Sequence, residues 1–113
     1  MSAKETTFKG QCYCAAIEFE AVVPGEPAVI HCHCGGCREW TGGIAYSALA
    51  CSSVTFTKGT PKQFQRKGGP LKSFCGDCGT GIMNNVVFGA IKHTVAAGIL
   101  SLGKDQPPLQ TAR

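Results

Sequence analysis

The sequence predicts a mainly β fold with short helical turns. Its 113 residues include 15 glycines and 6 prolines, and only 16% of them are charged. Turns are therefore frequent and charged helical faces are scarce, a balance that favours short strands. A chain of this length builds one core, so we expect residues 1–113 to form a single domain.

The first expected strand is the segment 15–23. Within it Ile17, Phe19 and Ala21 alternate with Glu18 and Glu20. This two-residue period is that of a strand with one buried face. Pro24 then ends the strand.

The later elements follow from apolar runs bounded by glycine, serine or proline. Strands are expected at 28–31, 44–50, 53–57, 63–67, 71–74, 81–84, 86–91 and 94–97. A helical turn or two is expected around 38–41, and the Gly-Gly-Pro loop 68–70 is a candidate mobile flap. Residues 101–113 are expected to form a loosely structured tail.

The sequence predicts a soluble, cytoplasmic protein with no membrane partner. No stretch approaches the roughly 18 apolar residues that a spanning helix needs, and the first ten residues lack the apolar segment of a signal peptide. A reducing compartment keeps thiols available for metal, whereas a secreted chain of this size pairs them as disulfides. We therefore expect metal at the cysteines.

The formal net charge of +4 does not indicate a nucleic acid as partner. It counts every cysteine as a neutral thiol, and seven thiolates with two Zn²⁺ bring it to +1. The chain has no block of five or six like charges and no aromatic residues set among basic ones. Scattered lysines on a solvated surface are the simpler interpretation.

Seven of the eight cysteines fall into three clusters. These are Cys12 and Cys14, then Cys32, Cys34 and Cys37, then Cys75 and Cys78. A CxxC turn brings two thiolates onto one tetrahedral ion at Zn–S distances of about 2.3 Å, and a CxC pair needs ligands from elsewhere. The simplest partition joins the first and third clusters into a four-cysteine structural site.

The middle cluster offers three thiolates from one loop of six residues. Three protein ligands with a vacant fourth position form the arrangement of a catalytic zinc. A closed site is an alternative that spacing does not exclude, because His31, His33 or Cys51 could supply the fourth ligand. A redox protein with Cys51 or a zinc-free Cys37 as nucleophile is a further alternative, and it predicts one zinc per chain instead of two.

The order of a CxC pair, then HCHCGGCREWTGG, then FCGDCGTG resembles the glutathione-dependent formaldehyde-activating enzyme family, whose domain is shared with centromere protein V. The resemblance runs from about Gly10 to about Gly98. It implies an Mss4-like β fold held together by zinc, with two Zn²⁺ per chain. The implied structural ligands are Cys12, Cys14, Cys75 and Cys78, and the implied catalytic ligands are Cys32, Cys34 and Cys37.

The chain departs from the family pattern in two places. Ala15 stands where the family usually has a glycine after the CxC pair. The segment 98–103 stands where the family usually has a glycine-leading segment with an Asp, and the chain stops soon after Pro107-Pro108 without the family's longer tail, so contacts between that tail and the substrate are not expected here.

The family's reaction joins glutathione to formaldehyde and gives S-hydroxymethylglutathione. The resemblance therefore implies a zinc-dependent carbon–sulfur lyase that forms or cleaves a thiol–aldehyde adduct, with a small thiol such as glutathione and a small aldehyde as partners. The alternative is a non-catalytic zinc-binding interaction module of the Mss4-like fold. That module would need a closed second zinc site or a basic extension, and no such extension is expected here.

Two residues beside the middle cluster are candidate catalytic groups. Arg38 suits a carboxylate of glutathione, because a guanidinium matches carboxylate geometry with two hydrogen bonds, and it equally suits a plain surface position. His33 suits acid or base catalysis near neutral pH, unless its ring points away from the metal. Cys51, in the run SALACSS, is expected to be a small buried apolar residue.

Overall fold

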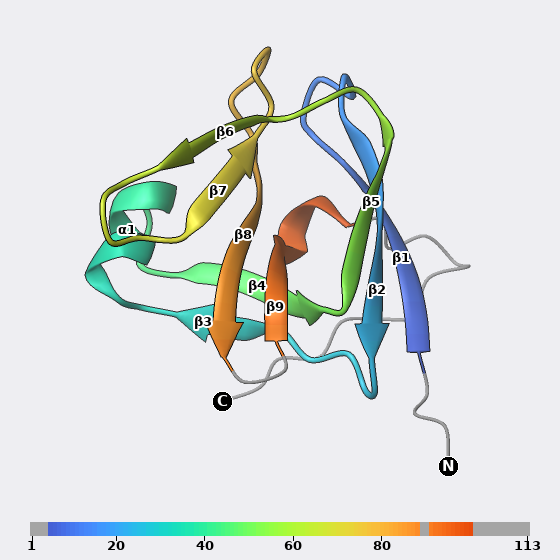
Figure 1. The fold of residues 1–113 in the computed structure, drawn as a ribbon, viewed down its shortest axis with the longest axis horizontal. Coiled ribbons are helices and arrows are strands. Elements are labelled where there is room, and N and C mark those ends of the chain that lie inside the picture. The colour runs from blue at the N-terminus through green and yellow to red at the C-terminus, as the bar shows by residue number, and fades with distance from the viewer. Residues whose placement is uncertain (1–4, 89–90, 101–113) are drawn as a thin grey trace.

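The computed structural model describes residues 5–88 and 91–100, which form two antiparallel sheets around a shared core (Figure 1). The smaller sheet has the order β1 (Glu5–Gln11), β2 (Glu18–Pro24), β5 (Ser53–Lys58). The larger has the order β3 (Ile30–Cys32), β4 (Tyr46–Cys51), β9 (Ile91–Ala96), β8 (Gly81–Phe88), β7 (Leu71–Phe74), β6 (Lys62–Gln65). The helical elements are α1 (Gly35–Thr41) and the short η1 (Ala97–Ile99). The expected mainly β fold is confirmed.

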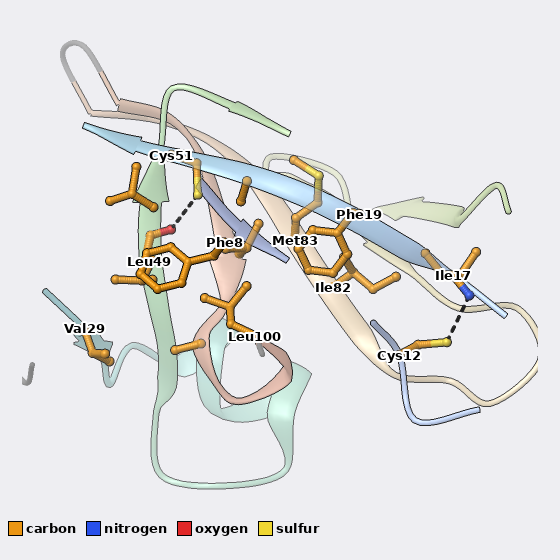
Figure 2. Packing of buried hydrophobic residues seen from close by; sticks show 14 of the residues in the cluster. Phe8, Cys12, Ile17, Phe19, Val29, Leu49, Cys51, Ile82, Met83 and Leu100 are labelled. Carbon is orange, nitrogen blue, oxygen red and sulfur yellow. Dashed lines mark hydrogen bonds between the residues drawn. The ribbon is translucent and has the colours of Figure 1, made fainter. Parts of the chain in front are cut away.

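The core lies between the two sheets. Every second residue of β2, namely Phe19, Ala21 and Val23, is buried, as the alternation in the sequence predicts. Figure 2 shows side chains of both sheets in this cluster, among them Phe8 of β1 and Leu49 of β4. Fully burying a side chain of this size stabilises the fold by about 1.5–3 kcal/mol, so the packing of the two sheets fixes their relative position.

Strand β1 is not among the expected elements, and its packing explains why. Its buried positions are Phe8 and Gly10, and Gly10 pairs with Phe19 of β2. A Cβ atom on Gly10 would lie 2.4 Å from the Phe19 ring, so the larger partner fills the space that a side chain of β1 would occupy. One buried side chain in seven residues leaves little periodicity for the sequence to reveal.

The three strands expected at 81–84, 86–91 and 94–97 are wrong, because the structure has two. The Asn84–Asn85 pair resembles a turn, but Asn84 is buried within β8, and Asn85 Oδ1 accepts a hydrogen bond from Nδ1 of His93 in β9. Tertiary pairing of β8 with β9 therefore overrides the local preference of asparagine for turns.

Helix α1 begins three residues earlier than the expected helical turn. Cys34 caps it, because its sulfur accepts a hydrogen bond from the Cys37 backbone N–H, and Gly42 ends it in the left-handed conformation with φ of 73°. No helix in the described part of the chain has the length and apolar character to cross a membrane. The expected tail 101–113 lies outside the described residues.

Candidate metal centres and the adjoining cavity

Four cysteines meet where the β1–β2 loop lies against the β7–β8 turn. The sulfur atoms of Cys12, Cys14, Cys75 and Cys78 all lie within 4.8 Å of one another. The Cys12–Cys14 distance is 3.7 Å and the Cys14–Cys75 distance is 3.8 Å. Tetrahedral zinc with bonds of about 2.3 Å separates its sulfur ligands by about 3.8 Å, so this donor set fits zinc.

Hydrogen bonds hold several of these sulfurs in place, and the pKa is lowered at Cys12 and Cys78 but raised at Cys14 to about 12. Backbone N–H groups donate to Cys12 Sγ from Ile17 at 3.3 Å and to Cys75 Sγ from Asp77 at 3.4 Å. The side chain and backbone of Thr80 lower the pKa of Cys78 to about 5. A thiolate is the form that binds metal, and partners beyond the ligands orient it.

Both loops turn through residues in the left-handed region. Gly79 has φ of 81°, and its N–H donates to the Cys75 carbonyl at 2.9 Å. Ala15 has φ of 65°, and it is the single non-glycine residue with positive φ among those described. Ala15 stands where the family usually has glycine, and its backbone adopts a conformation that favours glycine. An alanine in this conformation lowers the stability of the fold by about 1–2 kcal/mol.

The second cluster joins the end of β3 to the start of α1. The sulfur atoms of Cys32, Cys34 and Cys37 lie within 4.8 Å of one another. The Cys37 N–H donates to Cys34 Sγ at 3.4 Å and lowers the pKa of Cys34 to about 7. Burial raises the pKa of the Cys37 thiol to about 12. Three sulfurs with this spacing also fit a zinc ion.

None of the three candidates for a fourth ligand lies in this cluster. The exposed His31 bonds Ser47 Oγ through Nδ1 at 2.7 Å, and the exposed His33 donates from Nδ1 to the Ile44 carbonyl at 2.9 Å. Cys51 is 2% exposed in the core, as expected, with its sulfur directed to the Leu49 carbonyl (Figure 2). Within 5–88 and 91–100, the group holds no fourth cysteine, histidine or carboxylate ligand.

A cavity of about 610 Å³ adjoins the three-cysteine cluster. Its floor is the face of the larger sheet that points away from the core, and its walls are α1 and the loop that joins β6 to β7. The lining residues are Ile30, Cys32, Cys34, Gly36, Cys37, Glu39, Trp40, Tyr46, Ala48, Phe64, Arg66, Gly69, Pro70, Lys72, Asn84 and Thr94. All three cysteines thus border a space of the size that small-molecule sites have.

Few charged groups border this cavity. Lys72 of β7 places Nζ 5.0 Å from the centre of the Trp40 ring. The Asn84 amide is oriented so that its nitrogen donates to the Met83 carbonyl. Its oxygen then accepts a hydrogen bond from Lys72 Nζ at 3.1 Å. Arg66 and Glu39 form an ion pair of 2.9 Å at the exposed rim. Lys72 is thus the half-buried cation of the cavity.

The sequence-based candidates and the cavity lining agree only in part. The three cysteines of the middle cluster come together, whereas Arg38 and His33 are exposed and do not line the cavity. Lys72 and Asn84 were not expected to line a site. Their strands pair directly across the sheet, and no short sequence pattern shows this register.

The expected flap forms one wall of the cavity. Gly69 and Pro70 belong to the lining, and Gly68 has φ of 79°. The Gly69 N–H donates to the Arg66 carbonyl at 2.8 Å, and the Gln65 side chain donates to the Gly69 carbonyl at 3.0 Å. The loop is therefore a hydrogen-bonded turn beside the site.

Comparisons with known proteins agree with these features. A family model described as glutathione-dependent formaldehyde-activating enzyme matches residues 7–111. A crystal structure of a Rhodobacter sphaeroides protein is similar over 92% of this chain and 99% of that one, with a TM-score of 0.63 and 23% sequence identity. This likeness shows a shared fold. No curated protein matches the sequence significantly.

Proposed function

The chain belongs to the glutathione-dependent formaldehyde-activating enzyme family, and from this premise we propose that it is a zinc-dependent carbon–sulfur lyase. Its proposed reaction forms or cleaves a thiol–aldehyde adduct of the S-hydroxymethylglutathione kind. In the forming direction the thiol sulfur adds to the carbonyl carbon, a C–S bond forms, and the thiol proton ends on the oxygen, which becomes a hydroxyl. The reaction needs no oxidant or reductant.

One observation supports this proposal above the others. Cys32, Cys34 and Cys37 border a cavity, and no fourth protein ligand accompanies them among the described residues. A zinc ion held by three thiolates would supply activation of the aldehyde oxygen or stabilisation of the substrate thiolate. An interaction module needs neither a vacant ligand position nor a cavity beside it.

The residues around the cluster have separate proposed roles. The first turn of α1 orients the sulfurs, because the Cys37 N–H donates to Cys34 Sγ. Trp40 and Phe64 are apolar residues of the cavity lining, and their proposed role is to limit access of water to the reacting atoms. Arg38 and His33 remain candidates for contact with substrate outside the cavity.

The second metal is proposed to be structural. Cys12, Cys14, Cys75 and Cys78 provide four thiolates, which close the coordination of zinc and leave no position for substrate. We therefore propose two Zn²⁺ per chain, in one domain that spans residues 1–113. Thiols at all eight cysteines suit a reducing compartment, so the proposed location is the cytoplasm.

Zinc content and exchange kinetics test the proposal together. The purified protein is expected to bind two zinc ions and to accelerate exchange between glutathione, formaldehyde and their adduct, as measured by NMR exchange spectroscopy. Cys34→Ser is expected to bind one zinc ion and to lose the acceleration. Cys51→Ala, whose thiol lies outside both clusters, is the matched control and is expected to keep both properties.

Two results would contradict the proposal. A protein with two zinc ions that exchanges no faster than buffer would exclude this reaction. Normal exchange by a Cys34→Ser variant with one zinc ion would exclude the three-cysteine cluster as its site.

A further inference from the structure

Among the described residues, the cavity contains one cation without a carboxylate partner. Of its two basic side chains, Arg66 pairs with Glu39 at 2.9 Å. Lys72 has no carboxylate within 4.0 Å in the described ranges 5–88 and 91–100. Placing an ammonium group in a half-buried position without a paired carboxylate is costly, so such a group in a cavity is a candidate for a binding site.

The surroundings hold the Lys72 amine in one place. It lies over the Trp40 ring at 5.0 Å and donates to the Asn84 amide oxygen at 3.1 Å. Asn84 is itself 3% exposed, and its nitrogen donates to the Met83 carbonyl at 3.1 Å. An ammonium group has three donors, and these contacts use one of them. The remaining donors are available to a ligand in the cavity.

Lys72 and the three cysteines belong to the same cavity but to different elements. Lys72 comes from β7, whereas the cysteines come from the end of β3, the cap of α1 and α1 itself. Burial lowers the pKa of Lys72, and thiolates at Cys37, Cys34 and Cys32 oppose that shift. The negative charge of the thiolates therefore acts on an amine of the same cavity.

We propose that Lys72 binds the carboxylate of the thiol substrate while the substrate sulfur lies at the three-cysteine cluster. This inference rests on the proposed function and adds a substrate class to it, namely small thiols with an anionic group at the far end. A charged hydrogen bond of this kind contributes about tenfold to a hundredfold in affinity. The competing role for Lys72 is to neutralise the thiolates.

A pair of matched thiols tests the proposal by calorimetry on the zinc-loaded protein. The probes are 3-mercaptopropionate and 3-mercaptopropionamide, which have nearly the same shape and differ in charge. The carboxylate is expected to bind about tenfold more tightly or better. Trp40 is the single tryptophan of the chain and lines the cavity, so its fluorescence should change in the same titration.

Variants at two lysines identify the residue responsible. Lys72→Met is expected to lower the affinity for 3-mercaptopropionate to that for 3-mercaptopropionamide. The affinity for the amide and the zinc content are expected to stay unchanged. Lys72→Arg is expected to keep the preference. Lys67→Met removes the same charge from an exposed turn outside the lining and is expected to behave as the wild type.

Several outcomes would overturn the inference. Equal binding of the two thiols by the wild type would do so, even if Lys72→Met failed to fold. Loss of zinc from Lys72→Met, or equal weakening of both thiols, would indicate the neutralising role. The proposed function fails by a different result. Tighter binding of 3-mercaptopropionate without accelerated thiol–aldehyde exchange contradicts the reaction alone. Equal acceleration of exchange with both thiols contradicts the Lys72 subsite alone.

Discussion

The sulfur atoms of Cys14 and Cys75 lie 3.8 Å apart although 61 positions separate the two residues in the chain. Cys14 follows β1 of the smaller sheet, and Cys75 follows β7 of the larger one. A metal ion shared by these loops would therefore connect the two sheets at one end of the core.

The first prediction concerns this connection. Cys75→Ser is expected to remove one zinc ion and to lower the free energy of unfolding by about 3 kcal/mol or more, because structural zinc supplies much of the folding free energy of small domains. Urea unfolding with zinc analysis measures both effects. Cys51→Ala, which keeps all seven clustered thiols, is expected to cost about 1 kcal/mol and no zinc. Equal costs for the two variants would contradict the structural role.

The second prediction uses the left-handed turn after the CxC pair. Ala15→Gly is expected to raise the free energy of unfolding by about 0.5–1 kcal/mol, because relief of the strain at a φ of 65° outweighs the chain entropy that glycine adds to the unfolded state. Unfolding of the zinc-loaded variant measures the gain. Ala16→Gly, at a neighbouring residue without positive φ, is the control and is expected to lower stability. A loss at both positions would show that the turn is unstrained.

The third prediction concerns the contact between Gly10 and Phe19. Gly10→Ala is expected to cost about 1–3 kcal/mol, because the added methyl group would lie 2.4 Å from the Phe19 ring and one of the two strands must move. A double-mutant cycle with Phe19→Leu checks the cause, since the smaller side chain should reduce the cost of the alanine. The same cost in both backgrounds would place the strain elsewhere.

The fourth prediction concerns Cys51. Burial raises the pKa of its thiol to about 12, so at about pH 8 only around one molecule in ten thousand has the thiolate. Iodoacetamide is expected to leave Cys51 unmodified in the native protein and to modify it after unfolding in guanidinium chloride, as peptide mass spectrometry can show. Rapid native modification would favour the redox alternative, in which this residue is a nucleophile.

The sequence predicts those parts of the fold and site that depend on local spacing. The alternation in β2 is visible because one face of the strand meets the core and the other meets solvent or a polar surface. The cysteine grouping is visible because short CxC and CxxC segments can supply neighbouring ligands. The same groups of four and three come together in space.

Features that depend on register between distant segments are not visible in the sequence. Strand β1 packs through Gly10, a residue without a side chain. Lys72 and Asn84 become neighbours only when β7 pairs with β8. Arg38 shows the converse, because adjacency to Cys37 along the chain does not bring its side chain into the cavity lining. Periodicity shows which face of a strand is buried but not which strand lies beside it.

The two cysteine clusters also differ in when they can exist during synthesis of the chain. All members of the middle cluster emerge from the ribosome within six residues, whereas Cys12 and Cys14 emerge long before Cys75 and Cys78. Before Cys75 emerges, five of the seven clustered thiols are already present, and a metal ion could bind any of them. The proposed four-sulfur site would then form only when the later β7–β8 turn brings Cys75 and Cys78 to Cys12 and Cys14. With zinc bound as proposed, the order of the cysteines along the chain would make metal loading a part of folding.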